Sequence, residues 1–294
     1  MSGGRDARSR IRAVKIVLTY LDQNALIKLA YAMQREDLRQ RFETYGKANA
    51  SSVVLSPWHL VETANTNNID NAVKLASFID ALDPKWLLDR HDIRTLEVTE
   101  DFCKFLRVDY PTAPRVTTRR LAFATLRCED VSAVTIIRGW VRAPERLKPL
   151  ENAYKMNSDS LLRIRAFKKA GKLTPEFLKS TNRKLLEVWL PESTPHGLTY
   201  GPELRLCYLD QANIDNIPTL SIEYAISTNE WRLKGNDRTD RNTLIDKFHV
   251  VSALPYVDEI VTDDGLFKTI YPVAKETGHV RAKLVSNSEF FERF

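Results

Sequence analysis

Residues 14–33 read VKIVLTYLDQNALIKLAYAM and change their hydrophobic period at Asp22. The part before Asp22 is a nearly continuous apolar run, which is typical of a strand buried on both faces of a sheet. After Asp22, apolar residues recur from Ala25 to Met33 with the spacing of one helix face. This stretch therefore predicts a buried strand, an acidic residue at its end and a helix that follows directly.

The same order of strand and helix returns elsewhere in the chain. Residues 53–55 predict a second short strand, and Ser56-Pro57 leads from it into a helix, because proline is favoured in a first helical turn. The C-terminal third repeats the order, with a strand, a helix, a last strand and a final helix at residues 257–262, 264–270, 282–286 and 289–294. Successive units of this kind favour an α/β fold with a central parallel sheet between two helical layers.

Between residues 65 and 214 the apolar spacing is mostly helical, so we predict a mainly helical insertion there. The α/β core then consists of residues 13–64 and 215–294, and residues 1–12 form a disordered basic tail. The whole chain carries a formal net charge of +6, but residues 115–187 hold 17 Lys/Arg and 7 Asp/Glu, so the rest carries −4. The insertion is thus the basic part of the protein.

Composition excludes several classes of protein. The chain has three cysteines, Cys103, Cys128 and Cys207, which are too few and too scattered for a disulfide framework or a zinc site. Its apolar runs are too short to span a bilayer, and its basic start has no apolar segment behind it. We find no glycine-rich phosphate loop, serine nucleophile elbow or Cys-His pair. We therefore expect a soluble, cytoplasmic protein without a secretory leader.

Four acidic residues stand where such a sheet places an active site. Asp22 follows the first strand, Glu62 lies in the helix after the second, and Asp264 follows the strand that ends near residue 262. Asp246 lies early in the helix before that strand, at the same edge of the sheet. Clustered carboxylates raise one another's pKa, and a hard divalent cation such as Mg²⁺ or Mn²⁺ relieves the repulsion. Each acid taken singly is equally explained as a helix cap or a solvated residue.

Three segments in this order resemble the signature segments of PIN-domain nucleases. They are YLDQNALIKL at residues 20–29, LSPWHLVETA at residues 55–64 and DKFHVVSALPYVDEIVTDDGLF at residues 246–267. By this resemblance Asp22, Glu62, Asp246 and Asp264 form the metal site, and Thr262-Asp263-Asp264 matches the family's T-x-D motif. The resemblance also implies supporting roles for Asn24 and the Thr262 hydroxyl, with Asp263 as a reserve ligand. His59 and His249 adjoin the segments, and we expect them to be structural.

The resemblance implies a nuclease in which a carboxylate-bound Mg²⁺ or Mn²⁺ activates water to hydrolyse a phosphodiester, in RNA rather than DNA. The chain departs from the family in the offset of 184 positions from Glu62 to Asp246. This gap leaves Asp237 and Asp240 as alternatives for the third acid; we prefer Asp246 for its helical phase and its offset of 18 residues from Asp264. The alternative function is a catalytically silent module of the same fold that binds nucleic acid or protein.

The basic insertion suggests where nucleic acid would bind. An acidic site repels its own substrate, so cations elsewhere must supply the attraction, and a group of them lies at Arg163, Arg165, Lys168 and Lys169. A solvated helix face with nothing bound is the alternative for these residues. Besides nucleic acid, a second copy of the chain and an inhibitory protein are the partners we consider; we expect no membrane partner.

Overall fold

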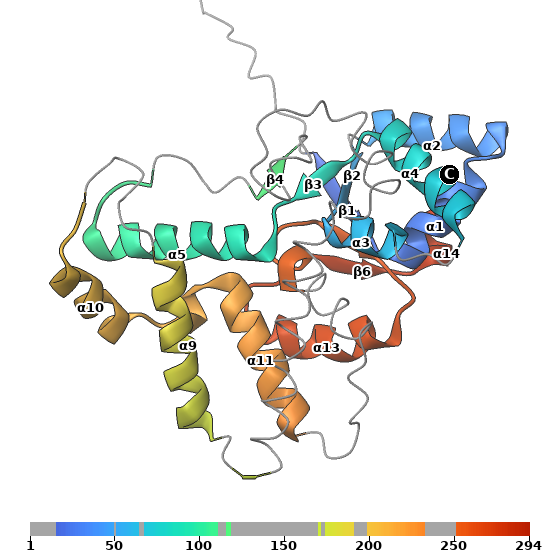
Figure 1. The fold of residues 1–294 in the computed structure, drawn as a ribbon. Coiled ribbons are helices and arrows are strands. Elements are labelled where there is room, and N and C mark those ends of the chain that lie inside the picture. Colours follow the sequence, from blue (N-terminus) through green and yellow to red (C-terminus); the bar gives the residue numbers. More distant parts are fainter. Residues whose placement is uncertain are drawn as a thin grey trace, which may run out of the picture.

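The computed structural model describes residues 16–49, 51–64, 68–110, 116–118, 170–171, 174–190, 199–232 and 251–294. Its centre is a six-stranded sheet in the order β4-β3-β2-β1-β5-β6 (Figure 1). The strands are β1 (Val17–Leu21), β2 (Ser51–Leu55), β3 (Lys85–Leu87), β4 (Thr117–Thr118), β5 (Glu259–Val261) and β6 (Lys283–Val285). Every neighbouring pair is parallel except β3 and β4. The predicted α/β class is confirmed, but the sheet is mixed because β4 runs antiparallel at its end.

The helices connect and cover these strands. They are α1 (Gln23–Ala32), α2 (Glu36–Ala48), α3 (Trp58–Ala64), α4 (Ile69–Leu82), α5 (Arg90–Leu106), α9 (Pro175–Trp189), α10 (Pro202–Gln211), α11 (Pro218–Arg232), α13 (Gly265–Lys275) and α14 (Asn287–Phe291), with a short 3-10 helix η2 (Ile214–Asn216). Among the described residues, no helix is long and apolar enough to cross a membrane.

Side chains that cap the helices explain where several of them begin. Asp22 caps α1, Asn68 caps α4, Asp264 caps α13 and Ser286 caps α14, each by accepting a hydrogen bond from a backbone N–H of the first turn. Such caps satisfy N–H groups that have no partner within the helix. Two of the four acids predicted to form the site therefore also start helices.

Alternate residues of β1, β2 and β5 enter two separate apolar cores, one on each face of the sheet. The first core contains Leu21, Leu55 and Val261 and packs against α1, α3, α4 and α14. The second core contains Tyr20, Val54 and Ile260 and packs against α11 and α13. The two faces are visible in Figure 1, where α13 and α11 lie on the side of the sheet away from α1 and α4. Apolar residues on both faces are the reason the strands appear as continuous apolar runs in the sequence.

Two strands lie within the segment 65–214 that the sequence predicted to be a helical insertion. β3 pairs in parallel with β2, through Leu55 and Trp86, and β4 pairs with β3. The sheet therefore continues past residue 64. The strand β3 belongs to it, and α4 is the helix that connects β3 to the elements before it. These strands are only three and two residues long, too short to show an alternating pattern.

A separate helical cluster lies beside the sheet, formed by α5, α9, α10 and α11 (Figure 1). Its buried apolar residues are Val98, Phe102, Leu186, Trp189, Leu190, Tyr208, Leu209, Ile217 and Leu220. Glu97 of α5 joins the cluster to the rest of the molecule: its carboxylate accepts hydrogen bonds from the Thr219 N–H, at 3.1 and 3.2 Å, and from the Tyr256 hydroxyl. Burial raises the pKa of Glu97, and these hydrogen bonds oppose the rise.

Candidate functional site

The candidate site lies at the carboxyl edge of the sheet, where the parallel strands end. The chain leaves β1 toward β2 on one side, and β5 later pairs on the other side of β1, so the strand order reverses between β1 and β5. Open parallel sheets bind ligands at such a reversal, outside the carboxyl ends of the strands. Leu21 pairs with Val261 there, and the N–H of Asp22 donates to the Val261 carbonyl at 3.1 Å. The residues that follow β1 and β5 therefore meet.

Asp22 is held rigidly at this point. Its side chain is 7% exposed, and its Oδ1 accepts a hydrogen bond of 2.6 Å from the Ala25 N–H. The carboxylate thus faces the positive end of the α1 dipole. Asn24, the predicted supporting residue, is exposed on the first turn of the same helix.

Asp264 is placed in the same way at the start of α13. Its Oδ1 accepts from the Leu266 N–H at 2.6 Å, and its own N–H donates to the Thr262 hydroxyl oxygen at 3.0 Å. Thr262 is buried, with 2% of its surface exposed. The Thr262 hydroxyl, predicted to have a supporting role, therefore contacts the backbone of Asp264, and it fixes the turn that carries that carboxylate.

Asp263, the predicted reserve ligand, has different partners. Its carboxylate accepts from the Asn287 side-chain amide at 2.6 Å and the Asn287 N–H at 3.2 Å, and it pairs with Lys28 at 3.3 Å. Partial burial alone would raise its pKa, but these hydrogen bonds and the Lys28 charge lower it. Asp263 thus ties the end of β5 to α14 and α1.

Glu62 lies in α3, and two hydrogen bonds hold that helix against the end of β1. The His59 Nε2 lies 2.8 Å from the Leu21 carbonyl oxygen, and the Gln23 side-chain amide donates to the Thr63 hydroxyl at 3.3 Å. Residues 59, 62 and 63 share one face of a helix because they are three or four positions apart. The half-buried Glu62 is therefore on the helix face that contacts the junction of β1 and α1.

The structure thus brings Asp22 and Asp264 to the ends of adjacent strands and places the helix face of Glu62 against the junction of β1 and α1. Within the described ranges, however, no group of three or more His, Cys, Asp or Glu is arranged to hold a metal ion. The preferred third acid, Asp246, and its alternatives Asp237 and Asp240 lie outside the described residues, as do Arg163, Arg165, Lys168 and Lys169. The complete four-acid site and the basic surface remain predictions.

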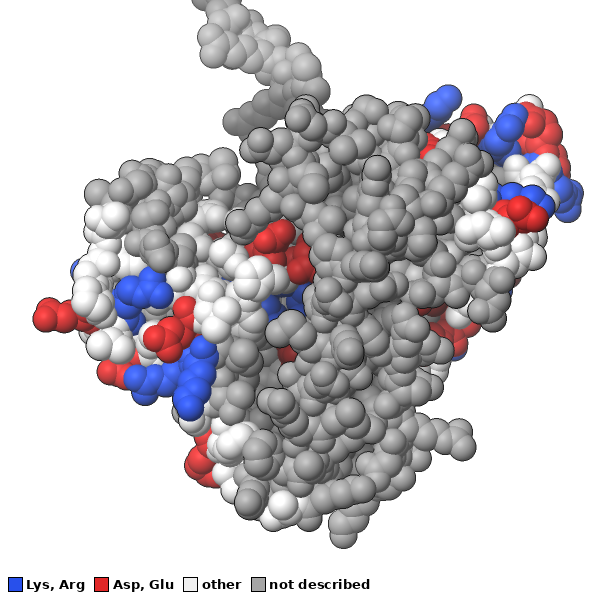
Figure 2. Space-filling view, viewed as in Figure 1, with Lys and Arg blue, Asp and Glu red and all other residues white. Residues whose placement is uncertain are grey.

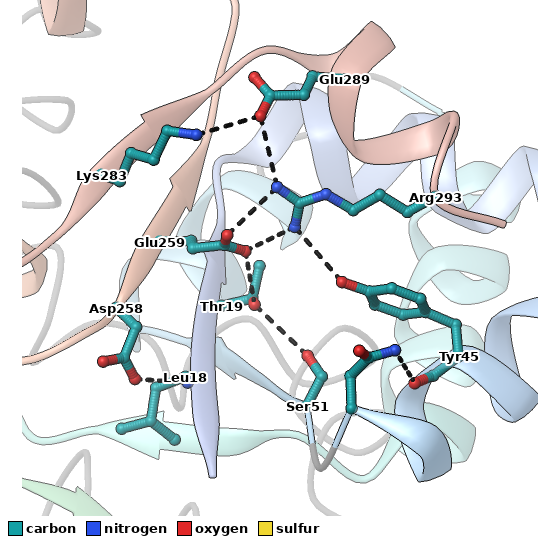
Figure 3. A network of polar contacts seen from close by, with 10 residues as sticks. Leu18, Thr19, Tyr45, Ser51, Asp258, Glu259, Lys283, Glu289 and Arg293 are labelled. Carbon is teal, nitrogen blue, oxygen red and sulfur yellow. Dashed lines mark hydrogen bonds and ion pairs between the residues drawn. The ribbon is translucent and has the colours of Figure 1, made fainter. Parts of the chain in front are cut away.

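The opposite, amino edge of the sheet also carries acids, and Figure 3 shows Glu259 there in contact with Arg293. Glu259 binds Arg293 through two hydrogen bonds, of 2.7 and 3.2 Å, and Asp258 binds Arg281 at 2.6 Å. Asp258 also accepts from the Leu18 N–H at 2.9 Å. Burial would lower the pKa of Arg293, but its hydrogen bond to Glu259 has the larger effect and raises it. This edge is a network of compensated charges that holds the C-terminal residues on the sheet.

Charges of both signs mix on the described surface. Figure 2 shows blue and red side chains next to one another over the helical cluster and over α2. Arg183 of α9 pairs with Asp210 of α10, and Arg39 pairs with Glu36 within α2. These helices therefore present no surface of a single sign in that view.

No known family model, curated protein or solved structure matches this chain. The resemblance to PIN domains thus remains a prediction from three short segments.

Sequence reasoning missed the residues that hold the acids in place. Gln23, Ser56 and Thr63 were given no role at the site, yet each contributes a hydrogen bond at this edge. The sequence predicted Asn287 as a cap of the last helix, but Ser286 is that cap and Asn287 binds Asp263. One signal was present: the interval from Ser56 to His59 is that of a capping box, with histidine in the position usually taken by Glu or Gln. The other partners are far apart in sequence, and no local pattern identifies them.

Proposed function

We propose that this protein is a metal-dependent nuclease of PIN-like fold, with Asp22, Glu62 and Asp264 among its catalytic carboxylates. The observation that carries the proposal is the junction of β1 and β5, where two aspartates follow adjacent parallel strands at the reversal of strand order. Hydrogen bonds from α3 to the end of β1 add the helix of Glu62 to the same edge. We also propose that the α/β fold has three layers and carries a mainly helical, basic insertion.

The donor set fits Mg²⁺ or Mn²⁺ by its chemistry. Asp22, Glu62 and Asp264 offer carboxylate oxygens, which these hard cations prefer to thiolates. When bound, such a cation supplies an activated water and neutralises phosphate charge. The protein's part is to hold the carboxylates: the α1 and α13 caps fix Asp22 and Asp264, and buried Thr262 fixes the turn between β5 and α13.

RNA is proposed ahead of DNA on the family resemblance alone. Attraction of either nucleic acid to an acidic edge requires cations elsewhere, and the basic residues 115–187 are the proposed source.

The second candidate is a catalytically silent binding module of the same fold. One observation favours it: among the described residues no three potential ligands are arranged for a metal ion. The caps formed by Asp22 and Asp264 give these residues a structural reason to be acidic without catalysis.

Incubation of the purified chain with end-labelled RNA and DNA, in Mn²⁺, Mg²⁺ or chelator, separates the two candidates. We expect metal-dependent cleavage that chelator abolishes and that Asp22→Asn protein lacks. Asp210→Asn is the matched control. Asp210 is an exposed aspartate of α10 that pairs with Arg183 and belongs to none of the segments that form the candidate site. Cleavage that persists in Asp22→Asn, or binding of RNA without cleavage in any metal, contradicts the nuclease assignment.

A further inference from the structure

A buried histidine connects the two elements that carry Asp22 and Glu62. His59 is fully buried in the first turn of α3. Its Nε2 lies 2.8 Å from the carbonyl oxygen of Leu21, the last residue of β1, and its Nδ1 lies 3.0 Å from the Ser56 backbone nitrogen. A carbonyl oxygen only accepts, so Nε2 carries the proton and Nδ1 accepts from the Ser56 N–H. Both ring nitrogens are thus used.

The two hydrogen bonds have different consequences. The bond from the Ser56 N–H to Nδ1 is local and completes the first turn of α3, as the side chain does in a capping box. The bond from Nε2 is long-range: it crosses 38 positions of sequence to β1 and ends on the carbonyl directly before Asp22. Tyr20 supports the ring from β1, because its hydroxyl donates to the Ser56 hydroxyl at 3.1 Å and its ring meets that of His59 edge-on at 5.3 Å.

The long-range bond controls the spacing of two acids. Asp22 is the residue after Leu21, and Glu62 follows His59 by three positions on the same helix face. Together with the bond from Gln23 to Thr63, this hydrogen bond thereby holds the backbone segments from which both carboxylates extend. We propose that His59 is a positioning residue that holds Asp22 and Glu62 at the spacing needed to share a divalent cation. This inference rests on the proposed function.

Two substitutions separate the long-range bond from the local one. In His59→Gln the terminal amide NH₂ lies where Nε2 lies and can still donate to the Leu21 carbonyl. In His59→Asn the side-chain oxygen lies where Nδ1 lies and can accept from Ser56, but the side chain is too short to reach Leu21. The affinity of each protein for Mn²⁺, measured by isothermal titration calorimetry, is the first readout, and cleavage is the second.

We expect His59→Gln to bind Mn²⁺ within about threefold of the wild type, and His59→Asn to bind about 10-fold to 100-fold more weakly, the range for residues that orient metal ligands. Hydrogen exchange of the peptide that spans residues 21–26 should also accelerate in His59→Asn but not in His59→Gln. His279→Asn, which removes an Nε2 contact with the Asp215 carbonyl outside this edge, is the control and should keep the wild-type affinity.

Equal Mn²⁺ affinity in both His59 variants, or the reverse order, overturns the positioning role. A wild-type protein that binds no Mn²⁺ overturns instead the proposed function itself. If His59→Asn does not fold, two-dimensional ¹H–¹⁵N NMR of the wild-type imidazole decides: a proton on Nε2 supports the bond to Leu21, and a proton on Nδ1 alone overturns it.

Discussion

The two edges of the sheet hold acidic residues in different surroundings. At the amino edge, Glu259 and Asp258 bind arginine side chains, so each negative charge meets a full positive charge. At the carboxyl edge, Asp22 and Asp264 accept hydrogen bonds from backbone N–H groups at helix starts, where the helix dipole supplies a partial positive charge. The arginine pairs at the amino edge stabilise the fold, whereas the helix starts at the carboxyl edge hold two carboxylates where a ligand of a parallel sheet would bind. The two edges therefore differ in the contacts that hold their acids.

The largest effect that this comparison predicts is on cleavage by Asp22→Asn. Asparagine caps helices as well as aspartate, so we expect unfolding free energy to change by less than about 0.5 kcal/mol. Cleavage should fall by at least about 100-fold, the order of magnitude for loss of one group that stabilises charge in a transition state. Denaturant titration and a cleavage assay on the same preparation measure both quantities. An equally folded Asp22→Asn protein with wild-type cleavage would show that this acid is only a cap.

The amino edge should give the opposite result. Arg293→Met leaves Glu259 without its two hydrogen bonds at a site where both side chains are about one-fifth exposed, so we expect about 2 kcal/mol of destabilisation and unchanged cleavage in the folded protein. Arg281→Met is the matched control, because Arg281 is 46% exposed and should contribute less than about 1 kcal/mol. Urea unfolding midpoints at constant m-value provide the test. A large loss of cleavage in Arg293→Met would mean that the two edges are not independent.

A smaller effect on cleavage is expected at Thr262, whose hydroxyl oxygen accepts a hydrogen bond from the Asp264 N–H. Thr262→Val keeps the shape of the side chain but removes the acceptor of the Asp264 N–H, at a cost of about 1 kcal/mol. Cleavage should decrease about 10-fold if Asp264 is a ligand, as for other residues that orient ligands. Thr269→Val tests specificity, since the Thr269 hydroxyl is exposed and bonds only within α13. Equal cleavage in the two variants would argue against a role of Thr262 at the site.

The smallest effect concerns Asp263. It lies at the carboxyl edge but, like the acids of the amino edge, it pairs with a basic side chain, Lys28. Its pKa is lowered, so the stability it contributes is present above the ordinary aspartate value of 3.8 and is lost as pH falls through the lower folded value. Asp263→Asn should therefore weaken the acid-induced loss of stability below about pH 3.8, while cleavage at neutral pH stays within a few-fold of wild type. Thermal unfolding from pH 2 to 6 measures the difference. An unchanged pH profile would mean that Asp263 is not tied to Asn287 and Lys28 in solution.

Local pattern was sufficient for the strands β1, β2, β5 and β6 and for the helices that directly follow them, but not for the short strands β3 and β4. The apolar run before Asp22 became β1, and the helical spacing after it became α1, because a strand buried on both faces and an amphipathic helix each leave a periodic signature in the sequence. β5, β6, α13 and α14 were predicted for the same reason, with end points that differ by a few residues. The order of these units also favoured parallel pairing, which holds for every neighbouring pair but β3 and β4.

Only the tertiary structure decided which partners the acids have. Asp22, Asp263 and Asp264 are alike in the sequence, yet one accepts from α1, one contacts Asn287 and Lys28, and one accepts from α13. The contact of His59 with Leu21 and that of Arg293 with Glu259 join residues more than 30 positions apart. No periodicity records such pairs, because they depend on how strands and helices pack against one another. Local hydrophobic period thus determines the elements, whereas long-range packing determines the surroundings of each charge.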